Sequence, residues 1–255
     1  MENTLNTSNT IGDLVNKIPG SAAVFEELGL DYYCQGNSSL AEACGQLGYD
    51  PDEILKGVYN TVPETPSRCE RDLSKANMQR LLDHVTEEHY GFVLGATPLL
   101  TQLIKQVVTR HGKSHPDLME LQNAFFLLCG DFGHHMLKEE KLLHKLTRQV
   151  ETGEEMVNLC DGRPEKQMEV LKQEHSNTIN HINEIRRLTN GYAIPEYACS
   201  RYRAMLKRMK KLELDLHRHI HEENNIIYPR ALKILETSCS TPQNPIATPS
   251  QNKRA

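Results

Sequence analysis

The sequence predicts an all-α protein in which a small helical module precedes a four-helix bundle. Three observations predict it. Apolar residues recur at spacings of three and four, no segment alternates apolar and polar residues as a strand would, and breaks containing Gly or Pro separate the periodic segments. The chain has 255 residues, of which 38% are apolar and 25% charged. These values are typical of an ordinary globular protein with one large domain or two smaller ones.

Residues 1–62 form the expected N-terminal module, which carries Cys34. Four short amphipathic segments lie between residues 11 and 60 and are separated by Pro or Gly. The stretch 61–72 then contains two prolines and several charges and interrupts all periodicity. We therefore interpret it as a linker between two domains.

Four long helical segments are expected in the second domain, residues 73–236. They span 73–96 extended by 98–110, then 117–149, 164–190 and 196–235. The breaks between them contain Gly or Pro, as connections in helical bundles commonly do. The last stretch, 237–255, is polar and Pro-rich without periodicity, so we expect it to be disordered.

Composition argues against several classes of function. The net charge of −5 and the isoelectric point of about 6.2 argue against nucleic acid or an anionic membrane as the main partner. The longest apolar run, 124–129, is far shorter than the ~20 residues that a membrane helix needs, and the first ten residues lack the features of a signal peptide. The seven cysteines include no closely spaced pair. We expect a cytoplasmic protein without membrane or nucleic-acid partners and without a disulfide framework.

Each long helix is expected to place one histidine on its buried face near the middle of its length. The four histidines are His89, His135, His175 and His219, and Glu139 and Glu223 follow four residues after the second and fourth of them. Residues four apart lie about 40° around a helix and one turn along it. Each His–Glu pair can therefore reach the same site.

These six polar side chains would point at one axis of the bundle, with no lysine or arginine at the same positions. Burying two carboxylates without partners would cost several kcal/mol each. A pair of metal ions removes this cost, because imidazole and carboxylate groups inside a four-helix bundle are the usual ligands of di-iron sites. Glu139 and Glu223 would bridge the ions and the histidines would bind terminally. One buried histidine alone is more often a hydrogen-bonded core residue, so the hypothesis depends on the agreement of four helices.

The other histidines are expected to have lesser roles. Those off the buried faces are expected at the surface or hydrogen-bonded behind the ligands, and they are His84, His134, His144, His181, His217 and His221. His111 and His115 lie in a loop beside Gly and Pro. We expect this pair to be exposed, and a role as additional ligands is the alternative.

Two parts of the chain resemble one known family. HHMLKEE (134–140), EHS (174–176) and HIHEENNIIYPRAL (219–232) resemble the hemerythrin-like domain of the iron-sulfur cluster repair di-iron protein family. IGDLVNKIPGSAAVFEELGLDYYCQGNSSLAEAC (11–44) resembles the small N-terminal domain of the same family. The resemblance implies a cytoplasmic, usually dimeric protein with two iron ions in an oxo- or hydroxo-bridged centre. It also implies that damaged iron-sulfur proteins are partners, and that nitric oxide or peroxide causes the damage.

Five of the residues selected by periodicity also match the family's ligand motifs: His135, Glu139, His175, His219 and Glu223. The chain departs from the family pattern at two places. Where the family has two adjacent cysteines, this chain has Tyr33 and Cys34, which leaves one thiol as a contact to nitric oxide, iron or a client protein. Alignment with the family's motif, which we call the family register, places the first ligand at Tyr90. The apolar face of the helix selects His89 instead, and we favour His89.

The resulting prediction is a non-enzymatic protein that repairs iron-sulfur clusters damaged by nitrosative or oxidative stress. One alternative is a hemerythrin-like carrier or sensor that binds O2 or NO without transferring iron. The N-terminal module argues mildly against this alternative, since a simple carrier does not need it. Another alternative is an oxidoreductase that reduces NO or peroxide at the same metals.

Overall fold

The computed structural model describes residues 5–18, 20–60, 73, 76–152 and 164–239, and it describes side chains for these residues except at 143–152, 164 and 235–239. Within these ranges every regular element is a helix, and strand-type pairing is limited to one isolated bridge between Thr10 and Ser39. The prediction of an all-α protein is therefore confirmed. The predicted linker at 61–72 lies outside the described residues.

The N-terminal module has four short helices around its own apolar core. The helices are α1 (Ile11–Lys17), α2 (Ser21–Leu28), α3 (Leu40–Leu47) and α4 (Pro51–Asn60). Helix α3 begins with a capping box, in which Ser39 and Glu42 each bond to the other's backbone N–H. It ends at Gly48, whose φ of 76° is left-handed. Leu14, Phe25 and Leu40 are fully buried in the core that these helices enclose.

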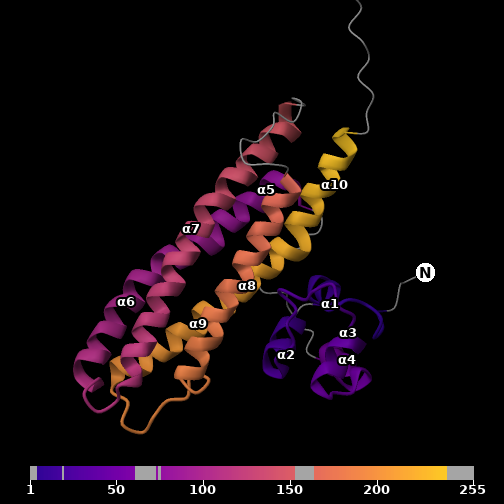
Figure 1. Ribbon diagram of the computed structural model, residues 1–255. Coiled ribbons are helices and arrows are strands. Elements are labelled where there is room, and N and C mark those ends of the chain that lie inside the picture. The colour runs from indigo at the N-terminus through magenta and orange to yellow at the C-terminus, as the bar shows by residue number, and fades with distance from the viewer. Residues whose placement is uncertain (1–4, 19, 61–72, 74–75, 153–163, 240–255) are drawn as a thin grey trace, which may run out of the picture.

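The second domain consists of four long helical rods (Figure 1). Its elements are α5 (Met78–His84), η2 (Val85–Tyr90), α6 (Gly91–His111), α7 (Asp117–Thr152), α8 (Pro164–Leu188), α9 (Ser200–Glu222), η3 (Glu223–Ile227) and α10 (Tyr228–Cys239). The first rod runs continuously from α5 through η2 to α6, and the fourth runs from α9 through η3 to α10. Helix α10 ends at Cys239, so the fourth rod extends slightly into the predicted tail, most of which lies outside the described residues.

The apolar faces expected from the sequence form the bundle core. Phe125 and Phe132 of α7, Ile182 of α8 and Leu216 of α9 are all buried. Each such side chain contributes about 1.5–3 kcal/mol to stability relative to an exposed position. This core encloses the polar residues described below from both ends.

Two π-helical segments, η2 and η3, interrupt the first and fourth rods. A π-helix bonds residue i to i+5 and so accommodates one extra residue per turn. After η2 the set of buried positions moves by one residue: Phe92, which a regular helix with Val85 and His89 on its buried face would bury, is half-buried, whereas Val93 is buried. Within η2 both His89 and Tyr90 are buried. Neighbouring residues of a helix point about 100° apart, so the two side chains face different surroundings.

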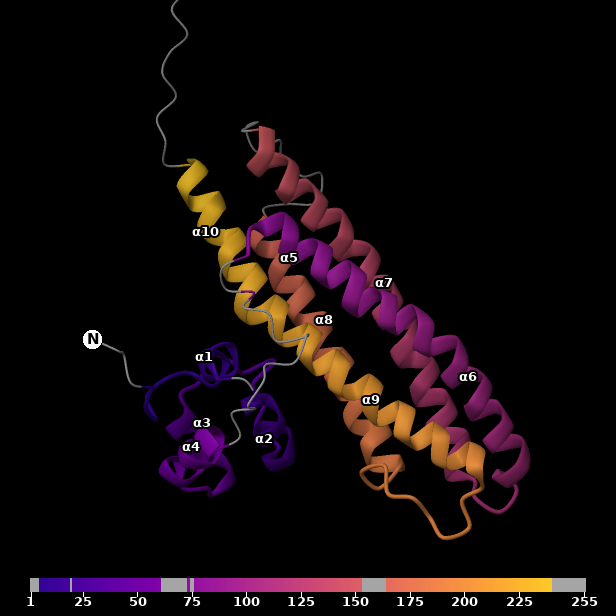
Figure 2. The ribbon, with the colours of Figure 1, turned by 180° about the vertical axis from the view of Figure 1, so that it is seen from behind.

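The N-terminal module lies against α9 and η3 of the bundle (Figures 1 and 2). His217 Nδ1 lies 2.8 Å from Glu26 Oε1, and the His217 ring stacks on Tyr33 with 4.0 Å between centroids. His221 Nε2 lies 3.0 Å from Asn16 Oδ1. We expected these histidines at the surface or behind the ligands, but they are buried between the two domains, because their faces of α9 are covered by the module.

One helical rod among the described residues, Met78–His111, is long and apolar enough to cross a membrane by length and composition alone. Core helices of soluble proteins can pass the same test. This rod places Leu100 and Ile104 in the bundle core, although Leu94 is exposed. The expectation that the chain has no membrane partner stays a prediction.

The separate cores lead to a prediction about the bundle. A fragment that begins at Leu73 should fold, because the bundle core contains no residue of the N-terminal module. We expect helical circular dichroism and a single cooperative unfolding transition in urea. A fragment that binds hydrophobic dyes and unfolds without cooperativity would show that the bundle depends on the module.

Candidate metal centre

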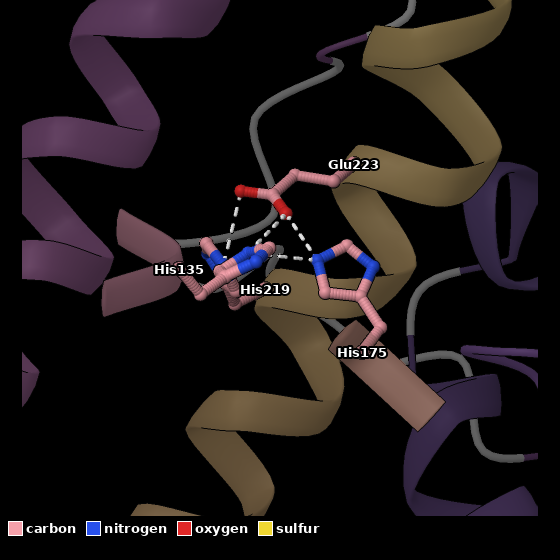
Figure 3. A group of neighbouring side chains, drawn as sticks. All are labelled: His135, His175, His219 and Glu223. Atoms are coloured by element: carbon pink, nitrogen blue, oxygen red, sulfur yellow. Dashed lines mark hydrogen bonds and ion pairs between the residues drawn. The ribbon is translucent and has the colours of Figure 1, made fainter. Parts of the chain in front are cut away.

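Four side chains from three rods converge inside the bundle. His135 of α7, His175 of α8, and His219 and Glu223 of the fourth rod place their ligand atoms within 4.8 Å of one another (Figure 3). All four side chains are buried to 1% exposure or less. We call these four residues the central site.

The Nε2 atoms of the three histidines and the carboxylate of Glu223 face the same point. Glu223 Oε2 lies 2.9 Å from His175 Nε2, and Glu223 Oε1 lies 3.0 Å from His219 Nε2. His135 Nε2 lies 3.1 Å from His175 Nε2 and 4.0 Å from Glu223 Oε2. A cation at this point would therefore have nitrogen and oxygen donors from three helical rods.

The outer nitrogens of two of these histidines contact acceptors that orient the rings. His135 Nδ1 lies 3.1 Å from a carboxylate oxygen of Glu174, which is itself paired with Lys138. His175 Nδ1 lies 3.1 Å from Asn224 Oδ1. When Nδ1 carries the proton that it donates outward, Nε2 has its lone pair free for a metal.

The central site is not satisfied by protein groups alone. His219 Nδ1, His219 Nε2 and Glu223 Oε1 are buried and make no hydrogen bond of good geometry among the described residues, although the last two atoms lie 3.0 Å apart. Buried polar atoms are almost always paired, because leaving one unpaired costs about 1–3 kcal/mol. Three imidazoles and a carboxylate are also a donor set that iron, zinc and manganese accept. The residues present therefore fit a bound metal cation.

The pKa values of the two buried glutamates, Glu139 and Glu223, are shifted in opposite directions. Burial would raise the pKa of Glu223, but the imidazoles of His219, His135 and His175 outweigh burial and hold this pKa well below its usual value. Burial and the neighbouring Glu223 carboxylate raise the pKa of Glu139. Burial lowers the pKa of His175. The site thus presents an anionic Glu223 beside an imidazole that is neutral at pH 7, which is the form that metals bind.

Glu139 lies beside the central site and is held by two tyrosines. Tyr90 donates a hydrogen bond of 2.7 Å to Glu139 Oε2, and Tyr228 donates one of 2.6 Å to Oε1. His135 Nε2 lies 3.6 Å from the same Oε2. Glu139 is thus within reach of the site, and its two oxygens are occupied by phenol groups.

The structure does not bring His89 into the central site, which differs from our expectation. His89 Nε2 lies 3.2 Å from Glu222, and its Nδ1 lies 3.4 Å from Asp215. Tyr90 is the residue of the first rod that faces Glu139. The physical reason is η2, because the phase argument for His89 assumed a regular α-helix through residue 90.

The loop histidines lie far from the central site. His111 contacts Cys199 Sγ at 3.4 Å, and His115 stacks on Tyr197 with 4.0 Å between centroids. Cys199 caps the start of α9, whereas His219 lies twenty residues further along this helix, at about 30 Å. These contacts give neither histidine a place among the candidate ligands.

Cys34 lies in the N-terminal module close to the fourth rod. Asn224 donates a hydrogen bond of 3.1 Å to the carbonyl of Tyr33, the residue before Cys34. The thiol is half-buried. Burial, and to a smaller extent the nearby Asp31 carboxylate, raise its pKa to about 12. Cys34 is therefore a neutral thiol near pH 7.

Sequence reasoning missed several residues of this region, which are Glu174, Asp215, Glu222, Asn224 and Tyr228. Tyr228 and Asn224 hold Glu139 and His175 respectively. One signal was present in the sequence: the run Glu222–Asn225 is polar although it interrupts a core helix. Polar side chains in such a place need partners, and the partners are the central site and its surroundings.

The fold and the site define a class: a helical bundle that binds cations through histidine and carboxylate side chains. The family model described as the hemerythrin HHE cation binding domain matches residues 96–231, which is more than half of the chain. The chain therefore belongs to the hemerythrin HHE family. A second model, described as a domain of unknown function (DUF542), matches residues 7–59, which correspond to the N-terminal module.

Curated relatives extend the similarity over both domains. The chain is 28% identical over 224 residues to a protein of Pectobacterium atrosepticum named iron-sulfur cluster repair protein YtfE, covering 88% of this chain and 96% of the relative. It is 27% identical over 222 residues to a YtfE protein of Escherichia coli, covering 87% and 96%. It is 24% identical over 220 residues to iron-sulfur cluster repair protein ScdA of Staphylococcus epidermidis, covering 86% and 96%.

The contacts of Glu139 lead to a prediction about stability. Tyr228→Phe removes the hydrogen bond to Oε1 and leaves a buried carboxyl oxygen without a donor. We expect the metal-free protein to lose about 1–3 kcal/mol of unfolding free energy, measured by urea denaturation. Tyr202→Phe, a buried tyrosine near the opposite end of the bundle, is the control. Equal stability of Tyr228→Phe and the parent would contradict the role given to this hydrogen bond.

Proposed function

We propose that this protein repairs iron-sulfur clusters damaged by nitrosative or oxidative stress, and that it does so with a di-iron centre inside the bundle. The observation that carries the proposal is the buried set of three imidazoles and one carboxylate in the central site, in which polar atoms of His219 and Glu223 lack a hydrogen bond of good geometry. The relatives named as iron-sulfur cluster repair proteins support it, because the similarity covers 96% of their length and includes both domains. Damaged iron-sulfur proteins are the corresponding partners.

The proposed ligands are His135, Glu139, His175, His219 and Glu223. Bound iron would supply ions for transfer and redox reactivity toward nitric oxide or peroxide. Glu223 faces all three imidazoles and is anionic, so it suits a bridging position between two ions. Glu139 reaches the site from the opposite rod and can act as the second bridge when its tyrosine contacts rearrange.

Tyr90 and His89 then have different parts in this proposal. Tyr90 occupies the place on the first rod that the family register assigns to a ligand, and it donates to Glu139. Burial and the Glu139 carboxylate raise the pKa of Tyr90, so its phenol keeps its proton. We propose that Tyr90 orients Glu139. His89 is held by Glu222 and Asp215, outside the central site.

The N-terminal module contributes Cys34, and the residue before it, Tyr33, is hydrogen-bonded to the fourth rod through Asn224. Asn224 connects the two domains, because its Oδ1 contacts His175 and its Nδ2 donates to the Tyr33 carbonyl. Cys34 follows directly in the chain. We propose that Cys34 contacts iron, nitric oxide or the client protein, and that it loses its proton when it binds a metal.

We further propose that the protein acts in the cytoplasm as a homodimer. Large apolar side chains are exposed on the neighbouring helices α6 and α7, among them Leu94, Phe126 and Leu127. Exposed apolar side chains in such number favour a protein interface. Sedimentation equilibrium should give twice the chain mass, and a monomer at micromolar concentration would contradict the dimer.

The bridging assignment leads to a prediction about iron content. The double variant Glu139→Ala/Glu223→Ala should lose most of its iron, because both ions lose charge and coordination. Circular dichroism should stay helical, since the apolar core is intact. The measurement is iron per chain after anaerobic purification, with the exposed Glu169→Ala as control. Full iron occupancy in the double variant would rule out the bridges.

The role of the thiol leads to a prediction about repair. Cys34→Ser should lower the rate at which a nitric-oxide-damaged iron-sulfur enzyme regains activity, while iron content stays at the parent level. Cys129→Ser, a half-buried cysteine of α7, should repair at the parent rate. Repair by Cys34→Ser at the parent rate would show that the thiol is dispensable. Steady-state consumption of nitric oxide or peroxide with an electron donor would favour an oxidoreductase instead.

A further inference from the structure

A second group of histidine and carboxylate side chains lies beside the central site. His84, His89 and Glu222 place their ligand atoms within 4.8 Å of one another. Glu222 Oε2 lies 3.1 Å from His84 Nε2 and 3.2 Å from His89 Nε2. Ligands at about 2.0–2.1 Å from one metal ion in a tetrahedral arrangement are separated by about 3.3 Å, which is close to these two distances. We call these three residues the lateral site.

The π-helix η2 is what brings the two histidines together. His84 and His89 are five residues apart, which in a regular α-helix would point them about 140° away from each other. In η2, where residue i bonds to i+5, residues five apart lie nearly above one another. Their rings contact edge to face, with 5.6 Å between centroids. Such π-helical turns frequently occur at functional sites.

Asp215 holds the far side of His89. Its Oδ1 lies 3.4 Å from His89 Nδ1, while His89 Nε2 faces Glu222. A histidine ligand usually has its other nitrogen directed at a carboxylate in this way, because the carboxylate fixes the ring and makes it a better donor. The arrangement Asp215–His89 therefore has the form of a metal ligand with its supporting group.

The group is not satisfied without a cation. Together with Asp215 it contains two carboxylates, and among the described residues the hydrogen bonds and ion pairs of Glu222 go only to the two imidazoles. His84 Nε2, His89 Nδ1 and Asp215 Oδ2 are buried without a hydrogen bond of good geometry. One proton on His89 would compensate one of these two negative charges and would leave the other without a counter-charge inside the group.

We propose that His84, His89 and Glu222 bind one Fe(II) ion, in addition to the metal of the central site. Two histidines and one carboxylate that leave other positions open are the ligand set of mononuclear Fe(II) sites. This inference goes beyond the proposed function and does not require that the protein repair iron-sulfur clusters.

The position of the lateral site indicates that its ion exchanges with solution. The His84 side chain is 19% exposed, so the site lies close to the surface on this side, although the Nε2 atom itself is buried. On the other side the His89 ring contacts the ring of His219, with 5.3 Å between centroids. Glu222 and Glu223 are adjacent in the chain and belong to the lateral and central sites respectively. The lateral site therefore lies between solvent and the central site.

Metal stoichiometry tests the proposal. Metal-free full-length protein is dialysed without oxygen against Fe2+ and, separately, against Co2+, whose absorption reports its ligands. His84→Ala and Glu222→Gln should each bind one ion fewer per chain than the parent. The parent should release that ion to a chelator faster than the rest. His181→Ala, a partly exposed histidine paired with Asp131 on α7, should bind as many ions as the parent.

Further variants separate this proposal from the central site. His175→Ala alters only the central site and should keep the rapidly exchanging ion, even if the central site binds no iron at all. Circular dichroism checks the fold, and His84→Ala, at a partly exposed position, decides the case if Glu222→Gln does not fold. An unchanged number of ions and an unchanged Co2+ spectrum in His84→Ala would overturn the proposal. Binding of Co2+ without binding of Fe2+ would overturn the assignment to iron.

Discussion

The burial of carboxylates on the axis of a helical bundle is the constraint on which the rest of the structure depends. Glu139 and Glu223 are fully buried, and among the residues that the structure describes neither is paired with a lysine or an arginine. The bundle compensates them differently, since Glu223 is surrounded by imidazoles and Glu139 accepts from two phenols. Glu223 is therefore stabilised as an anion, whereas burial and the Glu223 carboxylate raise the pKa of Glu139 although its two phenol donors favour the ionised form. A cation entering between them would stabilise the ionised form of both.

The π-helical segments determine which residues of the outer rods reach the interior. In η2 His89 and Tyr90 are both buried, one facing α9 and the other facing Glu139 of α7. The extra residue of the π-helix sets the phase at which these two side chains meet their partners. The same device therefore gives the first rod contacts to the central site and to the lateral site at one level of the bundle.

Much of the central site could be predicted from the sequence because α7, α8 and the part of α9 that carries its ligand are regular helices. His135, His175 and His219 lie on apolar faces with spacings of three and four, and these faces are buried as expected. The prediction for His89 also assumed the regular α-helical period, but η2 interrupts that period. Local propensity contains no clear signal for a π-turn. His217 and His221 could not be placed for another reason. Their burial depends on the N-terminal module, which periodicity within one helix does not reveal.

The polar run from Glu222 to Asn225 shows how one helical turn can serve several sites. Consecutive residues of a helix point about 80–100° apart, so four in succession face nearly all directions around it. Glu222 faces the lateral site, Glu223 faces the central site, and Asn224 connects His175 to the Tyr33 carbonyl. Asn225 donates to the carbonyls of the N-terminal module. Because all four side chains belong to one rigid turn, a shift of the module on α9 would move the ligands of both sites together.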